Sequence, residues 1–238
     1  MGENDHAQHT PPPTTAAGVA AMIDHALLKP TTTRDEIDAG CDLALELETA
    51  SVCVMPCWVE RVARRLGAGP VRTCTVIGFP HGIQSPGVKR AEAEAALAEG
   101  ATELDMVVNR SFVRSELWDE VRADLNSVTD VARTADAKTK IIFENCELTD
   151  DEKRRLCALS AECGADWVKT STGFGSGGAT EDDVRLMREA SPESVQLKAS
   201  GGIRTLDQLL RFAGLGCTRI GASGSRALVD ETRQRFGS

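Results

Sequence analysis

The chain of 238 residues is 41% hydrophobic and 26% charged, with a formal net charge of −9 at pH 7. This is the composition of an ordinary globular protein, and its acidic balance argues against a broad nucleic-acid surface, which needs clustered Lys and Arg. No hydrophobic run approaches the roughly 20 residues that span a membrane, and the N-terminus lacks the basic start and hydrophobic centre of a signal peptide. We therefore expect a cytoplasmic protein with neither nucleic acid nor membrane as a partner.

Residues 1–16 include three consecutive prolines and almost nothing hydrophobic. Such a segment cannot offset the entropy lost on ordering, so we expect a short flexible N-terminal extension. No linker divides residues 17–238, which are expected to form one domain.

The eight cysteines lie mostly in hydrophobic segments, where a free thiol behaves as a small hydrophobic group. None is in a Cys-x-x-Cys pair, and Cys53 and Cys57 have no second ligand pair to complete a structural zinc site. We therefore expect reduced thiols and no bound metal. His25 and His81 stand singly beside hydrophobic runs and are interpreted as structural residues rather than ligands.

From Gly18 onward, short hydrophobic runs alternate with segments long enough for helices. Residues 33–36 and 149–152 are capping boxes, in which a hydroxyl and a carboxylate satisfy free backbone N–H groups at a helix start. Thr180 and the three acids after it mark another helix start. A hydrophobic stripe at helical spacing predicts a helix over 113–132. The candidate strands lie near residues 22–25, 51–54, 72–77, 103–108, 140–143, 166–169, 195–198 and 218–221.

These β-then-α units, with nearly continuous hydrophobic strands, favour a parallel sheet buried on both faces. Their number fits a closed (β/α)8 barrel, so the chain is expected to be a single-domain α/β barrel. An open doubly wound sheet is the alternative. In a barrel the active site lies at the C-terminal ends of the strands, so the polar residues that follow each hydrophobic run are the candidates.

Lys169 and Lys198 each end a predicted strand and are followed by small or hydroxyl residues, which argues against two surface lysines. A free lysine has a pKa of about 10.4, and burial beside a second ammonium lowers it, leaving a neutral amine that attacks carbonyl carbon. The hypothesis is that Lys169 forms a Schiff base and Lys198 activates it, although the spacing alone also permits the reverse. Asp105 interrupts another hydrophobic strand, as a partner for a buried lysine, a proton carrier, or both. Glu103 is interpreted as a strand-entry or packing acid.

Glycine-rich turns follow the last two candidate strands. Gly201 and Gly202 come after the seventh, and Gly221, Gly224 and the intervening Ser223 come after the eighth. Barrels commonly build a phosphate site at these places from backbone N–H groups and a helix N-terminus. Such a site holds an anion without net positive charge. The two glycine-rich turns together indicate a phosphorylated ligand.

A series of motifs, in chain order, makes a pattern that is specific in its two lysine segments. The motifs are Ile23-Asp-His-Ala-Leu-Leu-Lys-Pro30, Ser51-Val-Cys-Val54, Val76-Ile-Gly-Phe-Pro80, Glu103-Leu-Asp-Met-Val-Val-Asn109, Lys169-Thr-Ser-Thr-Gly-Phe174, Gly177-Gly-Ala-Thr180 and Lys198-Ala-Ser-Gly-Gly-Ile-Arg-Thr205. Together they resemble the 2-deoxyribose-5-phosphate aldolases, from about Gly18 nearly to the C-terminus. The resemblance implies a (β/α)8 barrel and a class I aldolase without metal or other cofactor. Its substrate would be a small sugar phosphate, 2-deoxy-D-ribose 5-phosphate, cleaved reversibly to D-glyceraldehyde 3-phosphate and acetaldehyde.

By that resemblance, Lys169 is the Schiff-base lysine, Lys198 is the neighbour that lowers its pKa, and Asp105 is a proton relay acting with a water molecule. The remaining matches divide between the phosphate end and the rest of the pocket. The phosphate positions are Gly173, Gly201, Gly202, Gly221, Ser223 and Gly224, and the other pocket positions are Asp24, Cys53 and Thr172. The sequence does not define an oligomeric state, and a homodimer is one option.

Three positions depart from the family pattern. Ala26 stands where a threonine is usual, Met55 where a polar residue is common, and Phe174 where some members carry a lysine. Two readings besides this aldolase stay open: a Schiff-base aldolase for another sugar phosphate, and a non-catalytic phosphosugar-binding barrel. A pyridoxal-phosphate enzyme would also use a lysine and a phosphate site, but it would be coloured.

Overall fold

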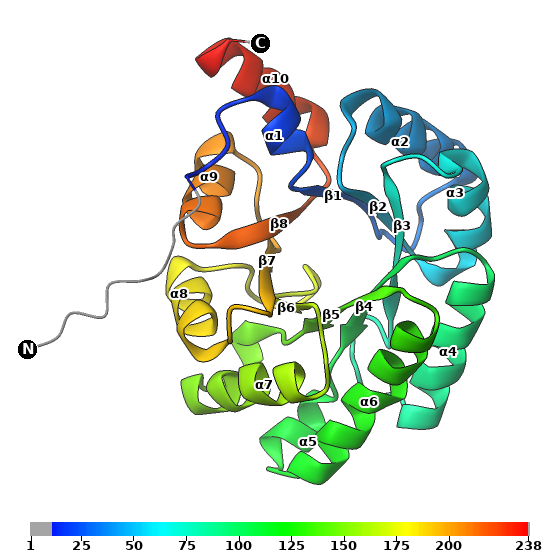
Figure 1. Cartoon of the computed structure of the whole chain (residues 1–238), viewed down its shortest axis with the longest axis vertical. Coiled ribbons are helices and arrows are strands. Elements are labelled where there is room, and N and C mark those ends of the chain that lie inside the picture. Colours follow the sequence, from blue (N-terminus) through cyan, green and yellow to red (C-terminus); the bar gives the residue numbers. More distant parts are fainter. Residues whose placement is uncertain (1–10, 238) are drawn as a thin grey trace, which may run out of the picture.

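The computed structural model describes residues 11–237 and shows a closed barrel of parallel strands surrounded by helices (Figure 1). Each strand pairs in parallel with the next in sequence, and β8 returns to pair with β1. The predicted (β/α)8 barrel is therefore confirmed, and the open sheet is excluded. The strands are β1 (Ile23–Leu27), β2 (Ser51–Val54), β3 (Arg72–Ile77), β4 (Glu103–Val107), β5 (Lys138–Ile142), β6 (Trp167–Lys169), β7 (Gln196–Ser200) and β8 (Cys217–Ala222).

The helices begin where the sequence supplies caps. Thr33 and Thr149 each form the predicted capping box, and the Thr180 side chain accepts a hydrogen bond from the backbone N–H of Asp183. The helices are α1 (Ala16–Ala20), α2 (Arg34–Leu47), α3 (Val59–Leu66), α4 (Pro86–Ala98), α5 (Arg110–Arg114), α6 (Trp118–Thr134), α7 (Asp150–Glu162), α8 (Glu181–Ala190), α9 (Leu206–Gly214) and α10 (Ser225–Phe236), with short 3-10 turns η1 (Pro56–Trp58) and η2 (Asn145–Glu147).

The helix predicted over 113–132 is two helices, α5 and α6. The Asn109 side chain caps α5 by accepting hydrogen bonds from the N–H groups of Ser111 and Phe112. Between the helices, Glu116 adopts a left-handed backbone with φ of 57°, which ends α5. Leu117 stands at this break and is 41% exposed, whereas Val113 before it and Val121 after it are fully buried.

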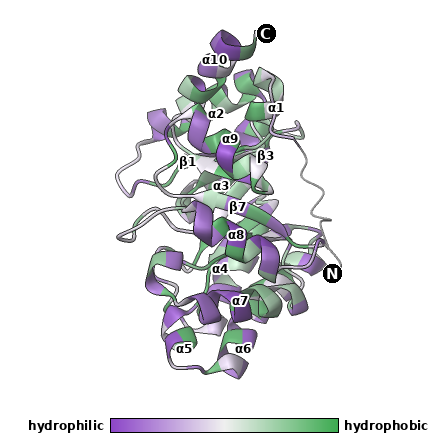
Figure 2. Cartoon of the chain, turned by 90° about the vertical axis from the view of Figure 1, so that its left-hand side faces the viewer, coloured by the Kyte–Doolittle hydropathy of each residue, from purple (hydrophilic) through white to green (hydrophobic). Residues whose placement is uncertain are grey.

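The two faces of the barrel strands differ in chemistry. The outward face is aliphatic, and residues such as Val52, Leu104, Ile141 and Val168 are fully buried against the helices. Hydrophilic and hydrophobic residues alternate along the surrounding helices, as the mixed colours in Figure 2 show. No helix within residues 11–237 is long and apolar enough to cross a membrane.

The N-terminal end of the described chain lies beside the C-terminal helix. Helix α1 starts at Ala16 behind an N-cap at Thr15, and it packs beside α10 (Figure 1). The flexible extension predicted over 1–16 falls largely on residues 1–10, which lie outside the described part of the chain.

Candidate active site

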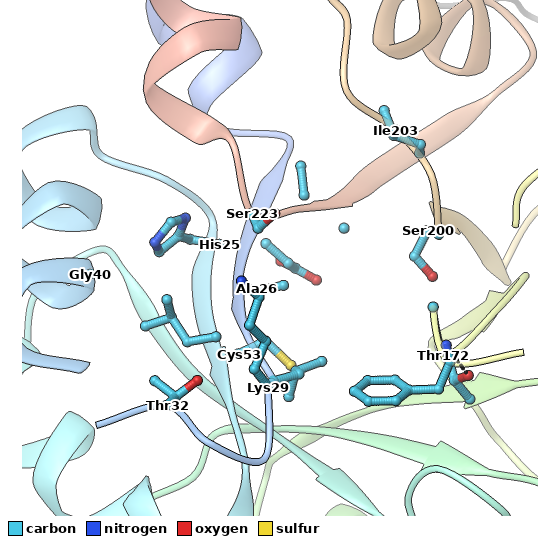
Figure 3. Close-up of a pocket in the computed structure, with 18 of the residues that line it drawn as sticks. His25, Ala26, Lys29, Thr32, Gly40, Cys53, Thr172, Ser200, Ile203 and Ser223 are labelled. Atoms are coloured by element: carbon cyan, nitrogen blue, oxygen red, sulfur yellow. Dashed lines mark hydrogen bonds between the residues drawn. The ribbon is translucent and has the colours of Figure 1, made fainter. Parts of the chain in front are cut away.

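The C-terminal ends of the strands open into a cavity of about 820 Å³. Figure 3 shows Cys53 beside Ala26, with Thr172 and Ser200 across from His25. Of the residues predicted from the sequence, those that line this cavity are Asp24, Cys53, Lys169, Thr172, Gly173, Lys198, Gly201, Gly202, Gly221 and Ser223. Asp105 lies beneath them, fully buried, and Gly224 is the N-cap of α10 outside the lining.

Lys169 and Lys198 lie on the neighbouring strands β6 and β7 and are partners in the strand register. Each Nζ donates to the same oxygen, Oδ2 of Asp105, at 2.7 Å. Both lysines are 2% exposed, so their amines meet inside the barrel rather than in solvent. The structure thus brings together the three residues that were predicted to carry the chemistry.

The floor beneath these lysines is an ionic network. Lys140 on β5 donates to Glu103 at 2.6 Å and to Asp105 Oδ1 at 2.8 Å. Arg219 on β8 bridges Glu103 and Asp24. Asp24 also faces Lys198, whose Nζ lies 2.5 Å from Asp24 Oδ2.

All eight strands contribute to this network, since Ser51 on β2 donates to Asp24 and Cys74 on β3 donates to Asp105. Barrel interiors are usually filled by branched aliphatic side chains. Here the middle of the interior is ionic, which is costly unless every charge is paired and hydrogen-bonded. A cluster of buried, paired charges of this kind is typical of a functional site.

The buried charges hold one another in their ionised forms. Burial raises the pKa of Asp105, but Lys140, Lys169 and Lys198 outweigh it and hold that pKa well below its ordinary value. Burial lowers the pKa of Lys198, but Asp105 and Asp24 reverse the effect and raise it above its ordinary value. Lys198 is therefore a permanent cation beside Lys169 at neutral pH, as the activating role requires.

Sequence reasoning missed three members of the network. Lys140 and Arg219 were not singled out, and Glu103 was interpreted as a strand-entry or packing acid. Side chains two apart in a strand face the same side, so Glu103 shares the inward face with Asp105, and Arg219 shares it with Gly221. This alternation fixes the face on which each side chain lies, but it does not tell which side chains of other strands it meets.

The wall on the β2 and β3 side is hydrophobic. Cys53 packs with Cys74 and Val76, and partly buried side chains including Met55 and Phe79 cover them. Phe174 meets Phe79 edge to face, with ring centroids 5.2 Å apart. Of the three departures from the family pattern, Ala26 and Phe174 line the cavity, and Met55 packs against the cluster that contains Cys53.

The loop after β6 is held by Glu144, which follows β5 and adopts a left-handed backbone with φ of 60°. Its buried carboxylate accepts hydrogen bonds from the hydroxyl and the backbone N–H of Thr172. A Cβ on Gly175 would come within 2.9 Å of that carboxyl group, so a side chain there would push the carboxylate away from Thr172. Glu144 thereby fixes the segment that carries Thr172 and Phe174 over the site.

The opposite end of the cavity is rich in glycine. Gly201 and Gly202 have φ of 88° and 79°, a backbone that turns N–H groups in directions that L-residues with a side chain rarely reach. A Cβ on Gly221 would lie 2.8 Å from the Ser200 Cβ, so a side chain there would disturb β7. Two cations that sequence reasoning did not select, Lys29 and Arg204, also line the cavity.

His25 has the hydrogen-bonded structural character predicted for it, whereas the His81 residue is exposed. The Nδ1 of His25 lies 2.8 Å from the Ser225 hydroxyl at the start of α10, and burial lowers its pKa to about 4, so the ring is neutral at pH 7. The backbone oxygen of His81 accepts a hydrogen bond from Arg110.

A family model described as DeoC/LacD family aldolase matches residues 19–230 of this chain. The chain belongs to that family. It is 49% identical over 219 residues to the deoxyribose-phosphate aldolase of Rhodopirellula baltica, covering 92% of this chain and 91% of that one. It is 47% identical over 211 residues to deoxyribose-phosphate aldolase 1 of Bacillus licheniformis, covering 89% and 94%.

The solved structures agree with this family assignment. The tetrameric deoxyribose phosphate aldolase from Aeropyrum pernix superposes with a TM-score of 0.85 at 30% sequence identity, covering 92% of each chain. The site can therefore be interpreted as that of an aldolase built on a (β/α)8 barrel.

Proposed function

We propose that this protein reversibly cleaves 2-deoxy-D-ribose 5-phosphate to D-glyceraldehyde 3-phosphate and acetaldehyde through a Schiff base on Lys169. The observation that carries the proposal is the convergence of Lys169 and Lys198 on one oxygen of Asp105 at the floor of the cavity. A barrel that only bound a phosphosugar would have no use for two buried amines on one carboxylate. The similarity to deoxyribose-phosphate aldolases gives the substrate.

The first step is attack of the free amine of Lys169 on the aldehyde carbon C1 of the open-chain sugar. Loss of water gives a protonated imine, which acts as the electron sink. Lys198 stays charged because Asp105 and Asp24 raise its pKa against the effect of burial, so a fixed cation lies beside the reacting amine.

The second step breaks the bond between C2 and C3. A base removes the proton of the C3 hydroxyl, the C2–C3 electron pair moves to the iminium, and D-glyceraldehyde 3-phosphate leaves. Asp105, acting through a water molecule, is that base and then returns a proton to C2 of the enamine. Hydrolysis of the resulting imine releases acetaldehyde and restores Lys169.

In this proposal the phosphate of the substrate binds at the glycine-rich end of the cavity. Gly201, Gly202 and Gly221 supply room and backbone N–H groups, and Ser223 stands exposed before the start of α10, where the helix dipole favours an anion. Arg204 supplies positive charge at the same end of the cavity. Because Phe174 replaces a lysine found in some relatives, the phosphate depends on these donors.

The test is acetaldehyde release from 2-deoxy-D-ribose 5-phosphate, compared with ribose 5-phosphate and with unphosphorylated 2-deoxyribose. The proposal predicts turnover of the deoxy sugar phosphate, much weaker turnover of 2-deoxyribose, and none with Lys169→Met. Faster turnover of another sugar phosphate would move the assignment to a different Schiff-base aldolase. Binding without turnover of any of them would indicate a phosphosugar-binding barrel.

We also propose that the protein works as a homo-oligomer. The support is the similarity to the aldolase from Aeropyrum pernix, which is a tetramer. Light scattering after size exclusion distinguishes a dimer or tetramer from a monomer of 25.4 kDa, which would contradict this proposal.

A further inference from the structure

Two cysteines that the proposed mechanism does not use face each other inside the barrel. Cys53 on β2 and Cys74 on β3 are partners in the strand register. Their sulfur atoms and a carboxylate oxygen of Asp105 all lie within 4.8 Å of one another. Neighbouring parallel strands are about 4.8 Å apart, which is within the Cα separation of about 4.4–6.8 Å that a disulfide spans. The register and the spacing of the sulfur atoms therefore place the pair within the reach of a disulfide.

The two thiols differ in access and in acidity. Cys53 lines the cavity, while Cys74 lies behind it and is fully buried. The neighbouring Cys74 side chain lowers the pKa of Cys53 against the opposing effect of burial, whereas burial raises the pKa of Cys74. Cys53 is thus the thiol that ionises and reacts with a small oxidant. Cys74 is the resolving thiol beside it.

A divalent metal is the other ligand that this cluster could hold. Asp105 would have to supply the third ligand atom, but its Oδ2 already accepts hydrogen bonds from Lys169 and Lys198, and its Oδ1 accepts one from Lys140. A cation would have to displace these ammonium groups from the carboxylate. The surrounding positive charge therefore favours a covalent bond between the sulfurs over a metal.

We propose that Cys53 and Cys74 form a reversible disulfide when a hydroperoxide enters the cavity, and that this disulfide switches the site off. The Cys53 thiolate attacks the terminal oxygen of the peroxide and the O–O bond breaks, which gives a sulfenic acid at Cys53 and releases hydroxide from hydrogen peroxide or an alkoxide from an organic hydroperoxide. The Cys74 thiol then attacks that sulfur, the S–S bond forms, and water leaves with the Cys74 proton. The two cysteines are oxidised and the peroxide is reduced. A small dithiol restores both thiols by exchange.

The disulfide acts on the site through Asp105. In the reduced protein the Cys74 thiol donates to Asp105 Oδ1 at 3.3 Å and lies 3.5 Å from the Lys140 ammonium. Joining Cys74 to Cys53 removes that hydrogen-bond donor and moves the Cys74 sulfur away from Asp105. The new bond also changes the part of the cavity wall that Cys53 forms. The loss of activity rests on the proposed function, whereas the disulfide itself does not.

The experiment treats the full-length protein with graded hydrogen peroxide and measures both intact mass with peptide mapping and aldolase turnover. The proposal predicts a loss of the mass of two hydrogen atoms, a cross-linked pair of peptides containing Cys53 and Cys74, and turnover that falls in proportion. Dithiothreitol should restore both the mass and the turnover. Cys74→Ser should instead gain oxygen at Cys53 under the same peroxide, with no cross-link to another cysteine.

The matched control is Cys57→Ser, which removes an exposed thiol and should oxidise and recover as the wild type does. A disulfide between other cysteines, or sulfinic acid at Cys53 with Cys74 still reduced, would overturn the proposal. A Cys53–Cys74 disulfide that leaves turnover unchanged would overturn the switch. If the untreated protein has no aldolase activity, the proposed function fails, and the mass data still decide whether the disulfide forms.

Discussion

Replacing Asp105 with asparagine removes one charge that three buried ammonium groups share. Lys140, Lys169 and Lys198 each donate to this carboxylate at 2.7–2.8 Å, and all are at most 3% exposed. Breaking a buried ion pair by removing one partner costs about 3–5 kcal/mol. Domains have total stabilities of about 5–15 kcal/mol, so we expect Asp105→Asn to fold but to lose about 3–5 kcal/mol of unfolding free energy at pH 7.

The pH dependence of this loss has a definite sign. The pKa of Asp105 is held well below its ordinary value in the folded protein, so its contribution is fully present above the unfolded pKa of about 3.9. The contribution is lost as the pH falls further. The difference in stability between wild type and Asp105→Asn should therefore be constant between pH 5 and pH 8 and should shrink below about pH 4. Urea denaturation across this range measures it.

The same variant should separate two steps of the reaction. A positioned general base contributes roughly 10²–10⁴-fold, so turnover of Asp105→Asn should fall by about that factor while imine formation at Lys169 continues. Asp136→Asn is the matched control, because Asp136 is exposed, precedes β5 at the other end of the barrel, and has a φ of 53° that asparagine tolerates. Turnover of Asp105→Asn within tenfold of the wild type, or a stability loss below about 1 kcal/mol, would refute the reasoning.

The remaining predictions concern the activating cation, the phosphate end and acid stability. Lys198→Met should lower turnover at pH 7 at least tenfold, because Lys169 loses its neighbouring positive charge. Lys138→Met changes an exposed lysine and should leave turnover unchanged. Equal turnover of the two variants would contradict this prediction. Ser223→Asp should raise KM for the phosphorylated sugar and leave that for 2-deoxyribose nearly unchanged; an equal rise for both would place the phosphate elsewhere. Asp24, like Asp105, has a lowered pKa, and the buried His25 ring stays neutral down to about pH 4, so wild-type stability should begin to fall below about pH 6.5 and fall more steeply below about pH 4. A level curve to pH 3, measured by thermal unfolding, would contradict this.

The barrel could be predicted because each strand is a short hydrophobic run followed by a polar residue. All the observed strands overlap the expected positions, and the helix caps at Thr33, Thr149 and Thr180 are local signals that tertiary packing did not override. The break between α5 and α6 was missed because it depends on the backbone of Glu116, a residue with no strong preference for the left-handed region.

The chemistry at the strand ends could be predicted, but the charge beneath it could not. Lys169 and Lys198 stand where a hydrophobic run ends, which is a visible contrast in the sequence. The three network residues that were missed lie on three different strands: Glu103 on β4, Lys140 on β5 and Arg219 on β8. Their side chains meet only because the closed barrel brings these strands around one interior. Lys140 and Arg219 therefore carried no signal by themselves, and Glu103 was read as a packing residue.

Reductive trapping tests the central claim most directly. The protein is incubated with 2-deoxy-D-ribose 5-phosphate or acetaldehyde, treated with borohydride, digested and mapped by mass spectrometry. We predict a single covalent adduct on Lys169, formed in the wild type and absent from Lys169→Met. An adduct on Lys198, or no adduct under conditions that support turnover, would contradict the assignment of Lys169 as the Schiff-base lysine.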